Sequence, residues 1–389
     1  MDAFYASVEL LRYPQLRGQA VVIGGGRRHQ PQPRDDGGFE FARLRDYVGR
    51  GVITTATYAA RAHGVHSGTG LMKAARLAPD AVLLPVDFDA YRRMSRAFKA
   101  AVLEISPVME DRGIDEVYLD LSDVPGAQDP VGHDPFGGVR ALAQEIRNNV
   151  RRATGLTCSI GLTPNKLLSK LASEMNKPDG LTLLTEADIP ARVWPLPARS
   201  LNGVGPKAAA RLEALGLSTI GDVAARDRAW LIERFGRSYG GWLAEASHGI
   251  DERSVVTRSE PVSMSRETTF DRDLHAVHDR RALRAVFDEL VEQLSLDLSR
   301  KGYLARTIGI KLRHDDFSTT TRDLTLDAPT CEARLMRHAA GQCLKRADLT
   351  RRMRLLGIRA SNLVKATVVT NRDNVGNQAA VSTVDPASA

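Results

Sequence analysis

The chain has 389 residues, of which 43% are hydrophobic and 26% charged, so it is long enough to form several domains with their own cores. This composition excludes a disordered, fibrous or disulfide-stapled mini-protein. Lysine and arginine number 54 against 47 aspartates and glutamates, and the resulting formal charge of +7 favours a polyanionic partner without identifying it.

The cysteine spacing and the apolar runs indicate in which part of the cell the protein lies. Cys158, Cys331 and Cys343 form no CxxC pair, which argues against a disulfide framework and a structural zinc site. The amino terminus shows no basic region followed by an apolar one, and no run reaches the roughly 18 to 20 apolar residues of a membrane span. We therefore expect a soluble, cytoplasmic protein.

Residues 1–180 predict an α+β domain, because strand-like and helix-like periodicities alternate along them. Residues 27–50 mix proline, glycine and charge without apolar periodicity, which predicts a solvated insertion with one short helix near 39–47. The other predicted elements are strands at 21–23, 51–57, 81–85, 114–121 and 157–162, and helices at 90–105, 139–153 and 165–176. Residues 59–78 predict a further helix with an irregular, glycine-rich middle.

The second half of the chain predicts a helical module and another α+β unit. Short helices joined by glycines fill 181–250, and the polar residues 251–266 are typical of a linker. Small polar residues over 364–389 predict a disordered tail. Between them, an edge strand at 268–271, helix 280–299, strands 307–312 and 320–326, helix 330–347 and strand 353–360 give the order β-α-β-β-α-β.

Adjacent carboxylates at Asp115 and Glu116 interrupt an apolar strand and carry the sharpest chemical signal. Two neighbouring acids repel each other unless a cation joins them, and hard oxygen ligands suit Mg²⁺. Successive strand residues point to opposite faces, so one carboxylate can bind metal while the other lies beside a reacting group. A solvated strand edge is the alternative interpretation.

Other residues favour phosphate and nucleic-acid contacts. Thr55, Tyr58 and Arg61 lie at a strand-to-helix junction that suits a phosphate group, and Lys177 is a point charge held by a tight turn. Surface packing and dipole compensation are the ordinary alternatives. The remaining candidates are Gly203, Gly205 and Lys207 of a helix-hairpin-helix pattern, and Lys311 and Arg313 of a basic stripe that suits backbone phosphates.

Taken in order, these motifs resemble those of the Y-family DNA polymerases over about residues 1–363. The matching segments are Asp2–Glu9, Gly51–Arg61, Ile114–Asp120, Ser159–Gly161, Asn165–Lys166, Met175–Gly180, Gly203–Gly205, His248–Asp251 and Lys311–Phe317. The resemblance implies an α+β right-hand fold with a ferredoxin-like palm at 1–10 and 85–180 and small fingers at 11–84. It also implies a helix-hairpin-helix thumb at 181–250, the linker, and a βαββαβ little finger at 267–363.

The resemblance also implies low-fidelity, template-directed DNA synthesis past damaged bases by a monomer that uses primer-template DNA, deoxynucleoside triphosphates and two Mg²⁺ ions. Asp115, Glu116 and the Met1 backbone carbonyl would bind metal, with Glu116 beside the primer 3′-hydroxyl. Tyr5 matches the steric gate that rejects a 2′-hydroxyl. The remaining nucleotide contacts that it implies are Phe4, Thr55, Tyr58, Arg61 and Lys177.

One departure concerns the first metal ligand. The family has an aspartate two residues before the position of Asp2, at the end of a first palm strand, and that position precedes Met1. We expect a natural start further upstream; the alternative is that this chain is catalytically weak. A separate possibility is that Asp2 replaces the missing ligand. We expect a disordered amino terminus to position Asp2 poorly, and positioning errors near 1 Å cost about 100-fold in rate, which argues against such a replacement.

Two further points stay open at this stage. The family's short clamp-binding peptide is not found after Leu363, and Gln293–Leu298, which resembles it in letters, lies in an amphipathic helix that predicts core packing.

Rival functions are a non-catalytic DNA-binding recruitment protein and a nucleotidyl cyclase. The retained site residues argue against the first, and the helix-hairpin-helix and basic carboxyl-terminal unit argue against the second.

Overall fold

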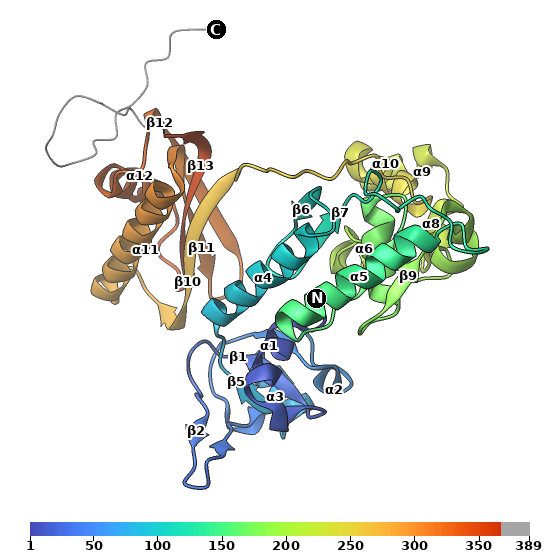
Figure 1. The fold of residues 1–389 in the computed structure, drawn as a ribbon. Helices are drawn as coiled ribbons and strands as arrows, with labels where there is room; N and C mark the ends of the chain where they lie inside the picture. Colours follow the sequence, from blue (N-terminus) through green and yellow to red (C-terminus); the bar gives the residue numbers. More distant parts are fainter. Residues whose placement is uncertain (367–389) are drawn as a thin grey trace, which may run out of the picture. The chain divides into compact units, whose positions relative to one another are not determined.

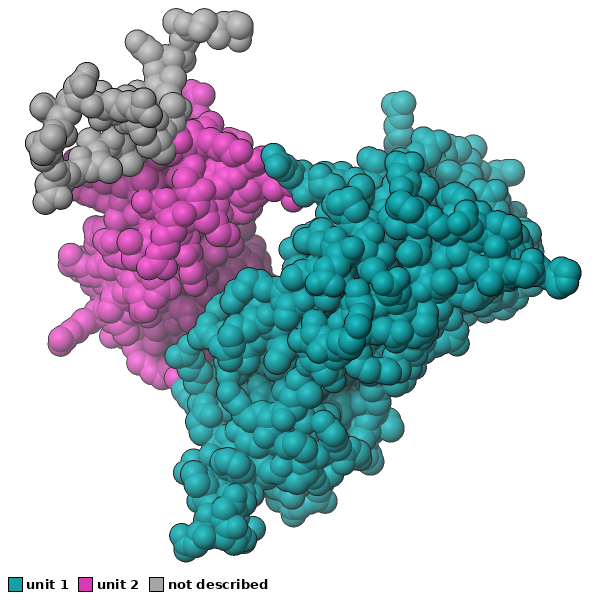
Figure 2. Space-filling model, viewed as in Figure 1, with its two compact units in different colours: residues 1–258 teal, residues 259–389 magenta. Residues whose placement is uncertain are grey.

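The computed structural model describes residues 1–366, which fall into two compact units (Figure 1). The first unit is Met1–Arg258 and the second begins at Ser259 (Figure 2). The mixed α and β content and several small sheets confirm the predicted fold class. No helix within residues 1–366 is long and apolar enough to span a lipid bilayer.

The predicted fingers region contains a three-stranded sheet in the order β4-β1-β5. Strand β1 pairs antiparallel with β4 and parallel with β5. The predicted helix over 59–78 is interrupted in its middle, as expected: it is two short helices, because Gly64 and Gly68 take φ values of 78° and 82° between them, which a helix does not allow. The elements are α1 (Phe4–Arg12), β1 (Val21–Gly24), β4 (Ile53–Ala56), α2 (Tyr58–Arg61), α3 (Leu71–Leu77) and β5 (Val82–Leu84).

The predicted insertion over 27–50 is solvated except at two residues of its second half, Leu44 and Tyr47. An exposed hairpin pairs β2 (Gln32–Pro33) with β3 (Phe39–Glu40), and the short helix predicted near 39–47 is a single 3₁₀ turn, Leu44–Asp46. Leu44 and Tyr47 are then buried in the fingers core, because a single 3₁₀ turn places their side chains on one face. The amide of Leu83 donates to the Ala42 carbonyl at 2.9 Å, so this second half also extends the sheet edge.

The strands of the predicted palm form two separate ladders. Strand β6 pairs antiparallel with β7, and β8 pairs parallel with β9. A cavity of about 140 Å³ lies between the ladders, lined by Val117–Leu119 on one side and Ile160–Leu162 on the other. The palm sheet is therefore not continuous as a ferredoxin-like sheet would be. The elements are α4 (Phe88–Leu103), β6 (Met109–Asp111), β7 (Val117–Leu119), α5 (Gly137–Thr154), β8 (Ile160–Leu162), α6 (Lys166–Met175) and β9 (Leu181–Leu183).

The predicted thumb region, residues 181–250, is largely helical, and its core continues onto one face of α6. Leu168 and Leu171 of α6 pack with Leu201, Leu212 and Leu243 in a single buried cluster. This packing fixes α6 against the thumb, so the opposite face of α6 has a defined position in the site. The thumb helices are α7 (Pro206–Ala214), α8 (Ile220–Ala224), α9 (Arg228–Phe235) and α10 (Arg237–Ser247).

The predicted linker over 251–266 is shorter than expected, because polar contacts fasten its first half to the palm. Glu110, which is 7% exposed, accepts hydrogen bonds from Lys166 Nζ at 2.8 Å and from the Val256 amide at 2.9 Å. Lys166 Nζ also donates to the Ser254 carbonyl at 2.7 Å. The second half of the predicted linker includes the start of β10 at Ser263.

The second unit has the predicted order β-α-β-β-α-β. Its antiparallel sheet runs β10-β13-β11-β12, so the first and last strands are neighbours. The strands are longer than predicted, and β13 continues through Lys365 into the predicted tail, whose residues 367–389 lie outside the described ones. The elements are β10 (Ser263–Leu274), α11 (Arg280–Lys301), β11 (Tyr303–His314), β12 (Thr319–Thr330), α12 (Ala333–Lys345) and β13 (Met353–Lys365).

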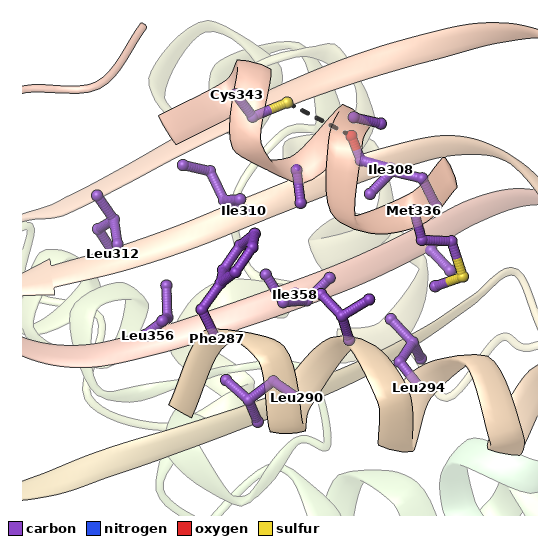
Figure 3. Packing of buried hydrophobic residues seen from close by; sticks show 14 of the residues in the cluster. Phe287, Leu290, Leu294, Ile308, Ile310, Leu312, Met336, Cys343, Leu356 and Ile358 are labelled. Carbon is purple, nitrogen blue, oxygen red and sulfur yellow. Dashed lines mark hydrogen bonds between the residues drawn. The ribbon is translucent and has the colours of Figure 1, made fainter. Parts of the chain in front are cut away.

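Both helices of this unit cover one face of the sheet. Phe287 and Leu290 of α11 pack with Ile308 and Ile358 of the sheet, and Met336 joins them from α12 (Figure 3). Within Gln293–Leu298, the side chains of Leu294 and Leu298 are also buried in this cluster. The core packing predicted for that clamp-like segment is therefore confirmed.

Candidate active site

Asp115 and Glu116 lie in the connection between β6 and β7, whereas the sequence predicted that they lie inside a strand over 114–121. Strand β7 begins only at Val117, because Gly113 takes a φ of 136° and turns the chain ahead of the carboxylates. The Arg112 amide donates to the Glu116 carbonyl at 3.1 Å and closes this turn. Both carboxylates thus project from a hairpin end, as the mechanism inferred from the sequence requires.

The two carboxylates have different surroundings. Burial raises the pKa of Asp115, while the amino-terminal ammonium of Met1 opposes that rise and the neighbouring Glu116 adds to it. The Met1 ammonium also donates to the Asp115 backbone carbonyl at 2.8 Å. Glu116 forms an ion pair with Lys170, a residue that the sequence interpretation did not include.

Beside Asp115 is a cavity of about 320 Å³ that collects most of the predicted nucleotide contacts. It lies between α1, the β4–α2 junction, the carboxylate hairpin and the end of α6. Its lining residues are Met1, Ala3, Phe4, Tyr5, Thr54, Thr55, Tyr58, Arg61, Ser67, Ile114, Asp115, Glu174 and Lys177. The structure therefore brings together residues more than 100 positions apart in sequence, and among the lining residues only Ser67 and Glu174 belong to no predicted motif or ligand set.

The polar groups at one side of this cavity suit an anionic ligand. The buried Tyr58 hydroxyl has no hydrogen-bond partner among the described residues. Arg61 lies with its guanidinium 4.9 Å from the Tyr58 ring centroid, and its Nε donates to the Ala56 carbonyl at 3.0 Å, which fixes the side chain. An orphaned buried hydroxyl costs stability unless a ligand pairs with it, and phosphate oxygens would do so.

Tyr5 lines the same cavity as Asp115. Its ring stacks on Tyr91 with centroids 4.2 Å apart and meets Phe88 edge-on at 6.0 Å. Phe4, the next ring along α1, is 3% exposed and belongs to the adjacent core. Packing against Tyr91 and Phe88 holds the Tyr5 ring rigidly, which is what a steric barrier requires.

Asp2 does not line this cavity, which argues against the alternative in which it replaces the missing metal ligand. It is 2% exposed, and its Oδ1 accepts a hydrogen bond from Ser159 Oγ at 2.7 Å. Its Oδ2 accepts from Thr157 Oγ1 at 2.9 Å and from the Asp179 amide at 2.8 Å. Asp2 therefore secures the turn that carries Lys177, and its carboxylate is committed to that role.

Lys170 and Glu174 are the site residues that sequence reasoning missed. Both lie on α6, one turn apart, and Lys170 Nζ lies 3.1 Å from Glu174 Oε1. Lys177 Nζ lies 2.7 Å from the same Glu174 oxygen. The i,i+4 spacing of a lysine and a glutamate was visible in the sequence, but the same spacing occurs on solvated helix surfaces.

The predicted thumb contacts form an exposed turn at a helix start. Gly205 caps α7, and Lys207 is exposed in its first turn. Gly203 has a φ of 123°, and a Cβ there would lie 2.7 Å from the Trp242 ring, so glycine is required. Backbone amides presented by such a turn suit a phosphate group.

Lys311 and Arg313 lie on the face of the second unit's sheet that faces away from α11 and α12. They alternate along β11 with the buried residues Ile310 and Leu312, which pack in the core. Lys311 Nζ forms an ion pair with Glu267 at 2.8 Å, and Arg313 Nε donates to Thr319 Oγ1 at 3.3 Å. A polyanion would therefore compete with Glu267 for Lys311.

The oxygen donors at the hairpin suit a hard divalent cation. Asp115 and Glu116 are neighbours, and Met1 lines the same cavity as Asp115. Residues 1–366 contain no cluster of three or more His, Cys, Asp or Glu side chains that could hold a metal. Asp115 and Glu116, together with the Met1 backbone carbonyl that the sequence resemblance implies, would form an oxygen-only donor set of the kind that Mg²⁺ prefers, whose remaining positions usually go to water and substrate phosphates.

Comparison with known proteins matches both units of the chain. A family model described as the impB/mucB/samB family matches residues 1–174, and that for the family's C-terminal domain matches residues 261–372. The DNA polymerase IV of Streptomyces coelicolor is 37% identical over 94% of this chain and 70% of its own length. That of Alkalilimnicola ehrlichii is 37% identical over 94% of each chain.

Solved structures agree on the fold. A Y-family DNA polymerase chimera has a TM-score of 0.76 at 21% identity, covering 94% of this chain and 97% of its own. The insertion ternary complex of Dbh DNA polymerase has a TM-score of 0.62 at 20% identity and the same coverage. Such structures have the palm, fingers, thumb and little-finger arrangement predicted from the sequence. The chain therefore belongs to the impB/mucB/samB family, the Y-family of DNA polymerases.

Proposed function

We propose that the chain is a translesion DNA polymerase that transfers nucleotides from deoxynucleoside triphosphates to a primer 3′-hydroxyl at the cavity beside Asp115. The observation that carries this proposal is the convergence of Asp115, Tyr5, Tyr58, Arg61 and Lys177 on one 320 Å³ space. Relatives named DNA polymerase IV, 37% identical over 94% of the chain, support the same activity.

Asp115 and Glu116, with the Met1 carbonyl, are the groups that would hold divalent metal ions, which Y-family polymerases use. We propose two Mg²⁺ ions, which would neutralise the attacking and leaving oxygens of an in-line displacement. Glu116 is half-exposed at the hairpin end, so it can reach the primer terminus, whereas Asp115 is the more buried of the two. Asp115, the more buried carboxylate, would supply the fixed oxygen donor to the metal ions.

Nucleotide positioning would fall to the groups across the cavity. Thr55 is buried at the strand end, and the Tyr58 hydroxyl and the Arg61 guanidinium lie at the helix that follows. Lys177 faces them from the turn secured by Asp2. Together they would orient the triphosphate for attack, and orientation alone is a large part of phosphoryl-transfer catalysis.

Replacing the Tyr5 ring is expected to relax sugar selectivity. Tyr5→Ala removes the rigid wall beside the sugar, so we expect ribonucleotide insertion, relative to deoxynucleotide insertion, to rise by at least about tenfold, or roughly 1.4 kcal/mol. Single-nucleotide kcat/KM values for dCTP and CTP measure this ratio. Tyr5→Phe keeps the ring and should retain selectivity; equal ratios in Tyr5→Ala and wild type would show that Tyr5 is only a packing residue.

The exposed lysine of the thumb is expected to bind a DNA phosphate. Lys207→Ala should weaken binding of primer-template DNA uniformly across sequences and lower the slope of log affinity against log salt by about 1. Fluorescence anisotropy titrations at several salt concentrations measure both quantities. Lys207→Arg retains the charge and should behave as wild type, whereas an unchanged slope in Lys207→Ala would remove Lys207 from the DNA interface.

The test of the translesion proposal is primer extension on templates with and without an abasic site, using the full chain and Mg²⁺. We expect extension of both, with the damaged template slower. Extension of the undamaged template alone would restrict the activity to ordinary synthesis. Binding of DNA without any extension would favour the recruitment protein considered from the sequence, for which the comparisons give no support.

A further inference from the structure

The polar face of α6 carries a row of alternating charges that runs through the site. Lys170 forms ion pairs with Glu116 and, at 3.1 Å, with Glu174. Glu174 in turn pairs with Lys177 at 2.7 Å. The row therefore links the proposed catalytic carboxylate, Glu116, to the proposed triphosphate ligand, Lys177, through two residues to which no role has been assigned.

Lys170 lies in the site rather than on the surface beside it. Its side chain is 23% exposed and lines the same 140 Å³ cavity as Asp115, Glu116 and Lys177. Burial lowers the pKa of Lys170, but the hydrogen bonds and charges of Glu116 and Glu174 outweigh it, and the net pKa is raised. The side chain is thus a fixed cation with two carboxylates in reach.

We propose that Lys170 is the resident counter-ion of the catalytic carboxylate: it neutralises Glu116 before divalent metal binds and moves onto Glu174 when Glu116 becomes a metal ligand. This inference rests on the proposed function of Glu116. The ammonium and a divalent cation compete for the same carboxylate, because like charges at such separations repel strongly. Glu174 is already in contact with Lys170, so the transfer needs only a side-chain rotation.

Glu174 would also couple the two halves of the site. While Lys170 is shared with Glu116, Glu174 holds Lys177 at 2.7 Å. Once Lys170 is paired with Glu174 alone, Glu174 is neutralised by one lysine and binds the other less tightly. Lys177 is then free to turn toward the phosphates of the nucleotide, whose cavity it lines together with Arg61 and Tyr58.

Binding of Mn²⁺, measured by electron paramagnetic resonance without DNA or nucleotide, tests the proposal. Lys170→Gln removes the competing cation, so we expect it to bind Mn²⁺ at least about fivefold more tightly than wild type. Lys73→Gln removes an exposed lysine of α3 and is the matched charge control, expected to bind as wild type. Unchanged or weaker binding by Lys170→Gln, with an unchanged circular dichroism spectrum, would overturn the proposal and leave Lys170 a structural residue.

A second variant has the opposite expected sign and covers the case in which Lys170→Gln does not fold. Glu174→Gln removes the alternative partner, so Lys170 stays on Glu116 and Mn²⁺ should bind at least about threefold more weakly. Tighter or equal binding by Glu174→Gln would contradict the proposal. Asp115→Asn distinguishes the proposed metal site from the proposed role of Lys170. Loss of Mn²⁺ binding in Asp115→Asn supports the metal site even if Lys170→Gln binds Mn²⁺ as wild type does. Absence of Mn²⁺ binding in wild type and in every variant would overturn both the metal site and the role of Lys170.

Discussion

Asp115→Asn is expected to lower the rate of nucleotide addition by at least about 100-fold, because metal-assisted charge stabilisation contributes several kcal/mol to such transfers. Affinity for primer-template DNA should stay within about twofold of wild type, a difference of roughly 0.4 kcal/mol. The proposed DNA contacts, Gly203, Gly205 and Lys207 of the thumb and Lys311 and Arg313 of the second unit, lie on other elements. Asparagine keeps the size of the side chain and removes its charge.

Single-turnover extension of a labelled primer and anisotropy titration of the same DNA measure the two effects separately. Asp120→Asn is the matched control, because Asp120 is an exposed carboxylate just past the other end of β7 whose Oδ1 accepts a hydrogen bond from the Ser122 amide at 2.9 Å. It should extend primers as wild type does. A parallel loss of DNA binding and extension in Asp115→Asn would show that Asp115 supports the fold rather than the chemistry.

Lys166→Met is expected to destabilise the first unit by about 3 kcal/mol, because it removes the buried cation of Glu110 and leaves only the exposed Arg112, 3.4 Å away, to pair with this carboxylate. Glu110 and Lys166 side chains are only 9% and 10% exposed, and their charged groups are 2.8 Å apart. The pair also fastens the segment around Ser254 and Val256 to the palm. Urea unfolding followed by circular dichroism measures the change in unfolding free energy.

The double variant Glu110→Met/Lys166→Met is the control, since replacing both partners with apolar side chains is often neutral. It should recover most of the stability lost in Lys166→Met. Equal stability of Lys166→Met and wild type would show that water or another group satisfies Glu110.

The contribution of this pair is expected to disappear in acid. Burial alone raises the pKa of Glu110, but the hydrogen bonds from Lys166 and the Val256 amide outweigh it, so the pKa is lowered from 4.5. A carboxyl whose folded-state pKa is lowered stabilises the protein above its unfolded pKa and loses that contribution as pH falls through the folded value. The stability difference between wild type and Lys166→Met should therefore be full at pH 7 and shrink below about pH 4.5. A difference that stays constant from pH 7 to pH 3 would contradict the assigned role.

Periodicity predicted the second unit well and the fingers less well, for physical reasons. The alternation Ile308, Ile310, Leu312 marks β11 because one face of its sheet is buried under helices and the other is polar. Leu44 and Tyr47 were assigned to a solvated insertion because proline, glycine and charge surround them. Their burial depends on contacts with strands elsewhere in the fingers, which no local pattern contains.

The residues of the candidate site that belong to sequence motifs could be predicted. Those that join the site only through ion pairs could not. Asp115, Tyr5, Tyr58, Arg61 and Lys177 line one cavity, as the motif order indicated. Lys170 and Glu174 gain their position because the other face of α6 is buried in the thumb core, which aims their charges at the hairpin. Their spacing alone does not distinguish that arrangement from a solvated helix. The role of Asp2 could not be predicted either, because its hydrogen bonds come from residues more than 150 positions away.

The most direct test of the central claim is single-nucleotide insertion by the full chain opposite each of the four template bases, with Mg²⁺ and one deoxynucleoside triphosphate at a time. A polymerase site beside Asp115 predicts that the complementary nucleotide is inserted most efficiently opposite every base, with frequent but slower misinsertion. Tight, salt-sensitive binding of the primer-template without insertion opposite any base, or insertion that ignores the template, would contradict it.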